Sequence, residues 1–157
     1  YSPNNPDVMA TSSYDSTIKI WHTGTMSHQS TLVGQSGVIY SMSWSRCGRY
    51  LASCSIKGTV FIWDTTSGES LQRLTHHRRQ LPVYCVDWCH GGKCLIASTG
   101  GDSTLVVFKD DGFICRRYLL PDAMFGCSWH PKDPNILIAG CADSNAYIFN
   151  ISEPGGR

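Results

Sequence analysis

The residues with the clearest capacity for metal chemistry stand close together in the middle of the chain. Cys85, Cys89, His90 and Cys94 supply thiols and an imidazole, which are the usual zinc ligands in proteins. Their spacing differs from that of a zinc knuckle, because no closely spaced pair faces a second pair at a suitable distance. Cys85 and Cys89 also belong to one predicted inner strand. We therefore expect no metal and no cofactor, with a metal-dependent enzyme at Cys85, Cys89 and His90 as an alternative.

Three aspartates recur at regular positions and invite an interpretation as catalytic acids. Asp15, Asp102 and Asp143 each stand six residues before an aromatic residue that ends a predicted strand. Equal positions in successive repeats lie too far apart for two carboxyl groups to flank one scissile bond. A turn aspartate instead accepts hydrogen bonds from the following backbone amides and from a neighbouring histidine. We therefore predict structural roles for these aspartates. The sequence also has neither a nucleophile elbow nor a phosphate loop, so we expect no enzyme activity.

A basic cluster stands where the chain departs from its own repeating pattern. Lys57 occupies a turn position that carries aspartate in the other repeats, and the connection after the same repeat reads His76-His77-Arg78-Arg79-Gln80. In equivalent neighbouring sheets, these two segments emerge on one face. Arginine and lysine pair with carboxylates and phosphates, and histidines add charge below about pH 6.5. Our hypothesis is a surface for an acidic or phosphorylated partner segment, and the alternative is a solvated loop. The predicted contact residues are Lys57, His76, His77, Arg78, Arg79, Tyr14 and Ile56.

A pattern with a period of about 40 to 45 residues positions all of these groups. One complete copy, residues 37–75, has four short runs rich in β-branched and aromatic residues, and its turns carry Gly, Ser, Asp or Thr. Its third run is apolar on both faces, as a sheet covered on both sides requires. The pattern predicts four-stranded antiparallel sheets. Two series of landmarks recur in step: Trp44, Trp88 and Trp129 in one, and Trp21, Trp63, Phe108 and Phe149 in the other.

The chain resembles the WD-repeat family over residues 8–151. The signature dipeptide stands once as Trp63-Asp64, and degraded copies are Trp21-His22, Phe108-Lys109 and Phe149-Asn150. Gly34-Gln35 takes the place of the Gly-His dipeptide before the second repeat, and His76-His77 is a displaced relic of it before the third. In this family, a hydrogen-bonded tetrad of His, Asp, Ser or Thr, and Trp braces each well-formed repeat. The resemblance implies that this tetrad is incomplete here. Family members that act as ligase adaptors carry Arg where this chain has Thr66, which argues against that role.

The resemblance implies an all-β fold, a partial β-propeller of about three and a half four-stranded blades. The blade segments are 8–33, 37–75, 83–119 and 123–151, and they hold three, four, four and three strands. The first lacks its innermost strand and the last its outermost, so we expect a fragment of a seven- or eight-bladed ring. The family implies a non-catalytic scaffold for protein partners within a larger protein, where the parent chain supplies the remaining blades.

Composition and charge indicate the class of partner and the cellular compartment. The chain has 157 residues, of which 41% are hydrophobic and 16% charged, and its net charge is +1. That charge gives no bulk attraction to nucleic acid, and no apolar run approaches the length of a membrane span. The eight cysteines stand singly on or beside predicted strands. We therefore expect reduced thiols and a cytoplasmic or nuclear protein that is not secreted.

Overall fold

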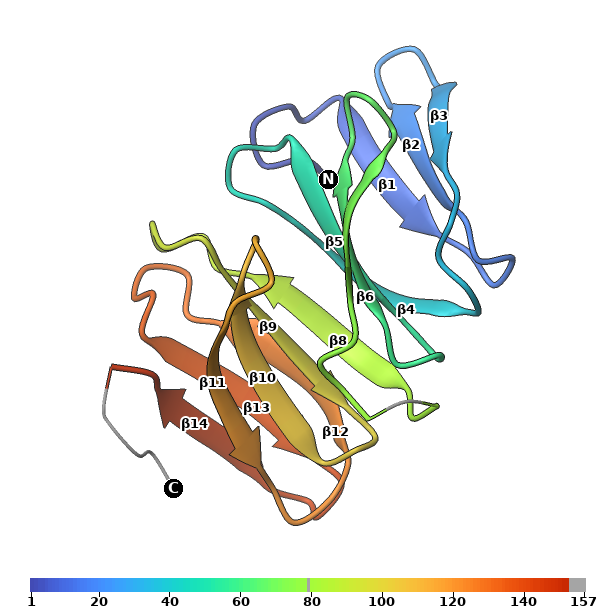
Figure 1. Cartoon of the computed structure of the whole chain (residues 1–157). Helices are drawn as coiled ribbons and strands as arrows, with labels where there is room; N and C mark the ends of the chain where they lie inside the picture. The colour runs from blue at the N-terminus through green and yellow to red at the C-terminus, as the bar shows by residue number, and fades with distance from the viewer. Residues whose placement is uncertain (79, 153–157) are drawn as a thin grey trace.

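The computed structural model describes residues 1–78 and 80–152, which form fourteen strands in four sheets and no helix (Figure 1). The sheets lie one after another along the chain. The first contains β1 (Val8–Ser12), β2 (Ile18–His22) and β3 (Ser27–Leu32). The second contains β4 (Ile39–Trp44), β5 (Tyr50–Ser55), β6 (Val60–Asp64) and β7 (Ser70–Leu74). The third contains β8 (Val83–Trp88), β9 (Leu95–Gly100), β10 (Thr104–Lys109) and β11 (Ile114–Leu119). The fourth contains β12 (Met124–Trp129), β13 (Ile136–Cys141) and β14 (Ala146–Asn150).

Each sheet is an antiparallel meander in which every strand pairs with the next strand in sequence. Short turns make this order possible, since antiparallel neighbours need only a few connecting residues. Among the described residues, the sheets have three, four, four and three strands, as the sequence predicts. The all-β prediction and the repeated four-stranded unit are therefore confirmed.

The hydrophobic core consists of three clusters, one between each pair of neighbouring sheets. The middle strand β6 is buried at all five residues because the second sheet is covered on both faces. Trp63, Ile62 and Leu51 are among the largest fully buried side chains. Burying each such side chain contributes about 1.5 to 3 kcal/mol. The sheets therefore stabilise one another by face-to-face packing.

The fourth sheet has one uncovered face, and the four sheets do not close into a ring (Figure 1). Burial alternates along β13, so Leu137 and Ala139 are buried while Ile138 is 45% exposed. On the neighbouring strand, Ile148 is 75% exposed. These observations agree with a partial propeller. In residues 1–78 and 80–152, no helix is long and apolar enough to cross a membrane.

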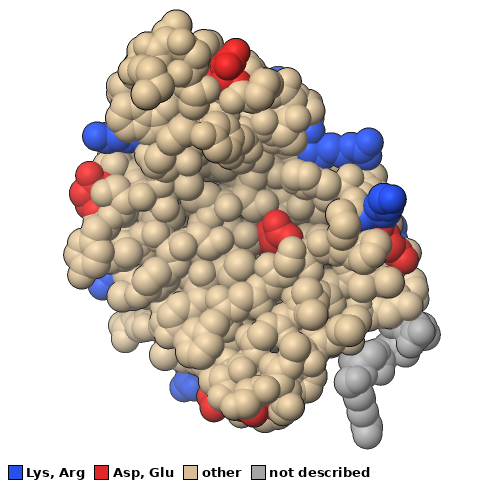
Figure 2. Space-filling view, turned by 180° about the vertical axis from the view of Figure 1, so that it is seen from behind, with Lys and Arg blue, Asp and Glu red and all other residues tan. Residues whose placement is uncertain are grey.

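Charged side chains lie mainly around the edge of the molecule on the face that Figure 2 shows. The middle of this face is largely uncharged, with an acidic group near its centre. The whole chain has 13 Lys and Arg residues against 12 Asp and Glu. Electrostatic recognition must therefore depend on local groups of charges.

Candidate functional site

One face of the molecule is formed by the β1–β2, β5–β6, β9–β10 and β13–β14 turns and by the connections between sheets (Figure 1). We refer to it as the turn face. In the last three sheets, the same backbone hydrogen bond fastens the turn to the residue before the innermost strand. The bonds join Ile56 N to Val38 O at 3.0 Å, Gly101 N to Pro82 O at 2.8 Å, and Ala142 N to Ala123 O at 2.8 Å. Each turn therefore adjoins the connection that enters its own sheet.

Lys57 is exposed at the turn between β5 and β6. Gly58 follows it with a φ of 76°, a conformation that side chains other than glycine seldom adopt. Beneath the turn, the buried Gln35 amide accepts a hydrogen bond from the Ser53 hydroxyl and donates one to the Thr59 carbonyl at 3.2 Å. Gln35 therefore forms its hydrogen bonds without a carboxylate at position 57, where the other turns carry aspartate. Lysine is therefore compatible with the fold here, and its ammonium reaches solvent.

Arg78 lies on the connection from β7 to β8, against the turn that carries Lys57. The packing is tight, because a Cβ atom on Gly58 would lie 2.8 Å from Leu81 O and 3.2 Å from Arg78 O. Lys57 and Arg73 also line one surface hollow of about 560 Å³. The Arg78 side chain is exposed. The structure thus brings the Lys57 turn and the Arg78 connection together.

His77 is buried, with a side chain only 1% exposed. Its Nδ1 lies 3.0 Å from Asp102 Oδ1, and its Nε2 lies 2.8 Å from Ser98 Oγ. We assign the ring proton to Nδ1, which donates to the carboxylate, so that Nε2 accepts from the Ser98 hydroxyl. The Thr104 hydroxyl and the Arg78 amide also donate to Asp102, at 2.7 and 2.8 Å. His77 therefore fastens the third sheet from inside and is not accessible to a partner.

This network forms three of the four members of the tetrad that the sequence suggests is incomplete. The third sheet supplies His77, Asp102 and Ser98, and Phe108 stands where tryptophan would complete the set. In the second sheet, Trp63 Nε1 donates to the Ser53 hydroxyl at 2.8 Å. The second and third sheets thus use different subsets of the tetrad hydrogen bonds.

His76 is half-buried, and its ring packs edge-on against Phe108 with centroids 5.1 Å apart. Burial lowers the pKa of His76, and the nearby Arg117 charge lowers it further. The ring is therefore neutral at pH 7 and adds no charge to the turn face. Arg79, which the sequence also suggests as a contact residue, lies outside the described residues.

The two predicted apolar anchors differ in exposure. Tyr14 projects from the turn between β1 and β2 and is 85% exposed. Ile56 is half-buried, and its Cγ2 lies 2.7 Å from the position of a Cβ atom on Gly37. Ile56 therefore packs against the connection that enters the second sheet. Of the predicted contact residues, Lys57, Arg78 and Tyr14 present exposed side chains on the turn face.

The other two turn aspartates bind groups in their own turns or in the strand that follows. Asp15 accepts hydrogen bonds from the amide and hydroxyl of Thr17, at 2.9 and 2.7 Å, which lower its pKa. Asp143 accepts from the Tyr147 hydroxyl at 2.6 Å and from the Asn145 amide at 3.0 Å. The Tyr147 bond is the main reason that the pKa of Asp143 falls to about 2. Their structural role stays a prediction.

The three candidate metal ligands contact different neighbours. The Cys85 thiol lies 3.5 Å from the Cys127 carbonyl, and His90 Nε2 lies 2.9 Å from the Trp44 carbonyl, while Cys89 is buried. In the part of the chain that the structure describes, no three His, Cys, Asp or Glu side chains are grouped closely enough to hold a metal ion. The metal-dependent alternative has no support from this geometry.

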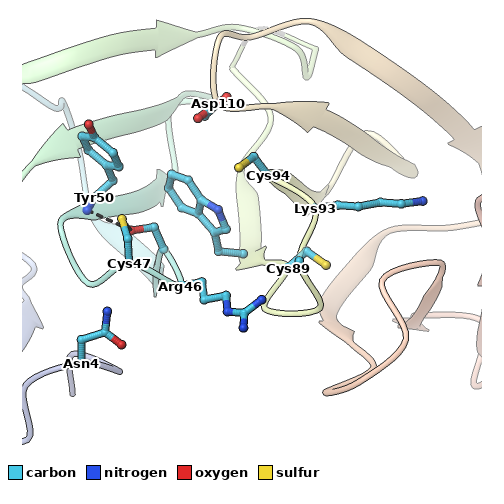
Figure 3. A pocket seen from close by; sticks show the side chains of 11 residues that line it. Asn4, Arg46, Cys47, Tyr50, Cys89, Lys93, Cys94 and Asp110 are labelled. Atoms are coloured by element: carbon cyan, nitrogen blue, oxygen red, sulfur yellow. Dashed lines mark hydrogen bonds between the residues drawn. The ribbon is translucent and has the colours of Figure 1, made fainter.

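A pocket that the sequence does not indicate lies at the opposite ends of the strands, between the second and third sheets (Figure 3). Its volume is about 440 Å³. Arg46 and Lys93 bring two cations to it, Asp110 brings an anion, and Tyr50 supplies an aromatic wall. The pocket is assembled mainly from turns of the second and third sheets, together with Asn4 of the N-terminal segment and the strand residues Tyr50 and Trp88. Each turn alone has the composition of a solvated loop, so no signal in the sequence identifies it.

We expect Cys47 and Cys94 to react with iodoacetamide at least about tenfold faster than Cys54 and Cys141 in the folded protein. The first two are exposed and the last two buried. Partial burial raises the pKa of the Cys47 thiol, but hydrogen bonds, first from Ser45, outweigh it and lower the pKa overall. Burial raises the pKa of Cys54 well above its usual value. Peptide mass spectrometry over time measures the rates. A urea-unfolded sample is the control, and equal rates in folded protein would contradict the prediction.

Comparison with known proteins identifies the repeats. The family model described as "WD domain, G-beta repeat" matches residues 1–22, 26–64 and 68–109. The F-box-like/WD repeat-containing protein TBL1X of Homo sapiens is 37% identical over 84 residues, which cover 54% of this chain and 14% of that protein. Coronin-7 of Rattus norvegicus is 30% identical over 165 residues, covering 96% of this chain and 17% of that protein.

A third relative is the probable cytosolic iron-sulfur protein assembly protein Ciao1 of Culex quinquefasciatus. It is 44% identical over 73 residues, which cover 44% of this chain and 21% of that protein. The chain thus spans less than a quarter of the length of each of these three relatives.

Proposed function

The chain belongs to the WD-repeat family, and from this premise we propose that it is a non-catalytic scaffold whose turn face binds an acidic or phosphorylated segment of a partner protein. The supporting observation is the exposed pair Lys57 and Arg78, carried by a turn and a connection that pack against each other. Arginine pairs bidentately with carboxylate or phosphate, and lysine adds a compact positive charge.

The proposed site uses charges that the fold does not need. Gln35 satisfies the network of the second sheet without a carboxylate at position 57. The backbone amide of Arg78 is held by Asp102 at 2.8 Å, which fixes the connection while the guanidinium stays exposed. A fixed backbone reduces the entropy lost when a ligand binds. Both cations are therefore available on rigid supports.

Charge reversal tests this proposal. We expect the double variant Lys57→Glu and Arg78→Glu to weaken binding of a Glu-rich phosphoserine peptide by about tenfold or more, because each lost charged hydrogen bond contributes about 1.5 to 3 kcal/mol. The unphosphorylated peptide should bind less tightly to the original protein. Fluorescence anisotropy at two salt concentrations measures both affinities, and higher salt should weaken binding.

Arg116→Glu is the matched control, because Arg116 is an exposed cation on the outermost strand β11, where charge protects a sheet edge. This variant should bind like the original protein. The proposal would be overturned if Arg116→Glu weakened peptide binding as much as the double variant does, or if the double variant bound the peptide with unchanged affinity.

The comparisons support a scaffold rather than one shared reaction. The names of the relatives refer to an F-box-like protein, a coronin and an iron-sulfur protein assembly protein, so the common element is the repeat. A cytoplasmic or nuclear location is part of the proposal. It is supported by the cysteines, all eight of which are free thiols.

We also propose that the remaining blades of a seven- or eight-bladed ring cover the bare face of the fourth sheet. The supporting observation is the exposure of Ile138 and Ile148, 45% and 75%, on a face whose counterparts in the second and third sheets are buried. The segments 17–21, 37–44 and 125–129 resemble WD repeat-containing protein seventeen, which would imply further blades and a long helical-repeat region. The intact mass of the natural protein tests this, and a mass near 17.4 kDa would contradict it.

A further inference from the structure

Three aromatic side chains form a row across the innermost strands. The ring centroids of Tyr40 and Tyr84 are 5.6 Å apart, and those of Tyr84 and Phe125 are 5.1 Å apart. Each ring comes from a different sheet, through β4, β8 and β12. Tyr40 is 44% exposed and Phe125 58% exposed, with Tyr84 half-buried between them. We refer to these three side chains as the aromatic row.

Each member of the aromatic row stands where strand pairing is interrupted. Between β4 and β5 the register passes from Ile39 opposite Ser55 to Ser41 opposite Cys54, so Tyr40 has no residue opposite it. The same shift leaves out Tyr84 in β8 and Phe125 in β12. A β-bulge of this kind re-aims a side chain. The interruption therefore recurs at the same strand position in three sheets, and an aromatic residue occupies it each time.

The aromatic row lies at the turn face. Each ring is the second residue of its innermost strand, and the residue before that strand is bonded to the turn of the same sheet. Gly101 shows the closeness directly, because a Cβ atom on it would lie 3.5 Å from Tyr84 Cε2. The turns that carry charge therefore border the aromatic row.

The accessible charges beside the aromatic row change sign along its length. Lys57 borders the end in the second sheet, and Arg78 lies between the turns of the second and third sheets; both are exposed cations. Asp122 and Asp143 belong to the connection and turn of the fourth sheet, at the other end, and Asp122 is exposed. Asp102 lies between them, but its side chain is only 4% exposed and is bonded to His77. Within the three sheets that carry the aromatic row, the turn face is therefore positive toward the second sheet and negative toward the fourth, while the exposed Asp15 lies beyond the positive end in the first sheet.

We propose that the aromatic row and its two charged ends bind one extended peptide segment with an apolar side chain in its middle, acidic or phosphorylated residues at one end and basic residues at the other. This rests on the proposed function, since Lys57 and Arg78 take the acidic end, and it adds an apolar anchor and a basic end. Aromatic rings bury large areas and dominate binding energy at interfaces. With a rise of about 3.3 Å per residue, about three extended residues span the aromatic row.

Synthetic peptides separate these contributions. The dipolar probe has three Glu, a central Phe and three Lys, the uniformly acidic probe replaces Lys with Glu, and the third probe replaces Phe with Ala. We expect the dipolar probe to bind about tenfold more tightly than the probe without Phe. It should also bind more tightly than the uniformly acidic probe. Fluorescence anisotropy with the protein at its natural length measures the three affinities.

Protein variants locate the contacts. Tyr84→Ala should weaken binding of the dipolar probe about tenfold, and Tyr40→Ser, at a more exposed ring, should also weaken it. Phe113→Ala is the matched control, because Phe113 is 64% exposed in the turn before β11 and lies off the aromatic row. Asp122→Lys should weaken binding of the dipolar probe and strengthen binding of the uniformly acidic probe. Thermal midpoints check that each variant is folded.

The outcomes distinguish this inference from the proposed function. If Tyr84→Ala and Tyr40→Ser bind the dipolar probe like the original protein while Lys57→Glu with Arg78→Glu loses it, the inference is wrong and the proposed function stands. If the aromatic variants weaken binding but the charge reversal leaves the uniformly acidic probe unaffected, the proposed function is wrong. Unchanged binding in all variants would overturn both.

Discussion

Replacing Asp102 with alanine is expected to lower the free energy of unfolding by about 3 kcal/mol, because it leaves a buried network without its acceptor. The carboxylate accepts hydrogen bonds from His77 Nδ1, the Arg78 amide, and the amide and hydroxyl of Thr104. Its side chain is only 4% exposed, so water cannot readily replace it. Urea denaturation followed by tryptophan fluorescence measures the loss.

The same substitution should change the pH dependence of stability. Burial raises the pKa of Asp102, but the hydrogen bonds from His77, the Arg78 amide and Thr104 outweigh it and hold the pKa well below its usual range. The pKa in the folded state is thus lower than the unfolded value of about 3.9. The contribution to stability is present above that value and is lost as pH falls from about 4 toward the folded pKa. Asp102→Ala should lose less stability over this acidic range than the original protein.

Asp15→Ala is the control for this prediction. Asp15 occupies the same turn position in the first sheet, but it is exposed, and its carboxylate accepts hydrogen bonds from the amide and hydroxyl of Thr17 just before β2. The control should therefore unfold much closer to the original protein. Equal destabilisation by the two variants would mean that burial of the network is not the source of its effect. Asp102→Ala also removes the hydrogen bond to the Arg78 amide, so it should weaken binding of the phosphoserine peptide.

Trp63→Ala should have the largest effect on stability, about 4 kcal/mol, since it removes a large buried side chain and leaves a cavity. Trp63 is 1% exposed, stacks on Phe61 with centroids 5.3 Å apart, and donates to Ser53. It belongs to the cluster between the first two sheets. The midpoint of urea denaturation should fall accordingly.

Trp21→Ala is the matched control for Trp63→Ala. Trp21 holds the same strand position in the first sheet and donates to the Thr11 hydroxyl at 2.8 Å, but it is only half-buried. Its removal should cost clearly less than removal of Trp63. A similar cost at both positions would contradict the view that burial between two sheets sets the size of the effect.

The repeating strand pattern is predictable from the sequence because it is written locally and then repeated. The apolar run of β6 indicates a strand covered on both faces, and all five of its residues are buried. The spacing of Trp44, Trp88 and Trp129 identifies equivalent innermost strands in three sheets. The position of Lys57 in its turn and of Arg78 in the following connection then places both on one face. Repetition supplied information that a single segment would lack.

Tertiary structure alone decided which side chains on that face are accessible. The sequence allows two interpretations of His77, as a contact residue of the basic cluster or as a relic of the Gly-His dipeptide, and the fold decides between them because His77 bonds to Asp102 inside the third sheet. Tyr84 follows the alternation of an ordinary strand, but a one-residue shift in pairing turns it onto the turn face beside Tyr40. The pocket lined by Arg46 depends on the packing of two sheets.

The sequence by itself therefore determined the strands and their order, because turn composition and apolar runs are local and recur at a fixed period along the chain, and it indicated the family through signature residues such as Trp63-Asp64. Only the folded chain decided the hydrogen-bond network of His77, the aromatic row and the pocket. The physical reason is that burial, pairing register and cavity shape depend on contacts between residues far apart in sequence. Alternation along a strand cannot specify those contacts.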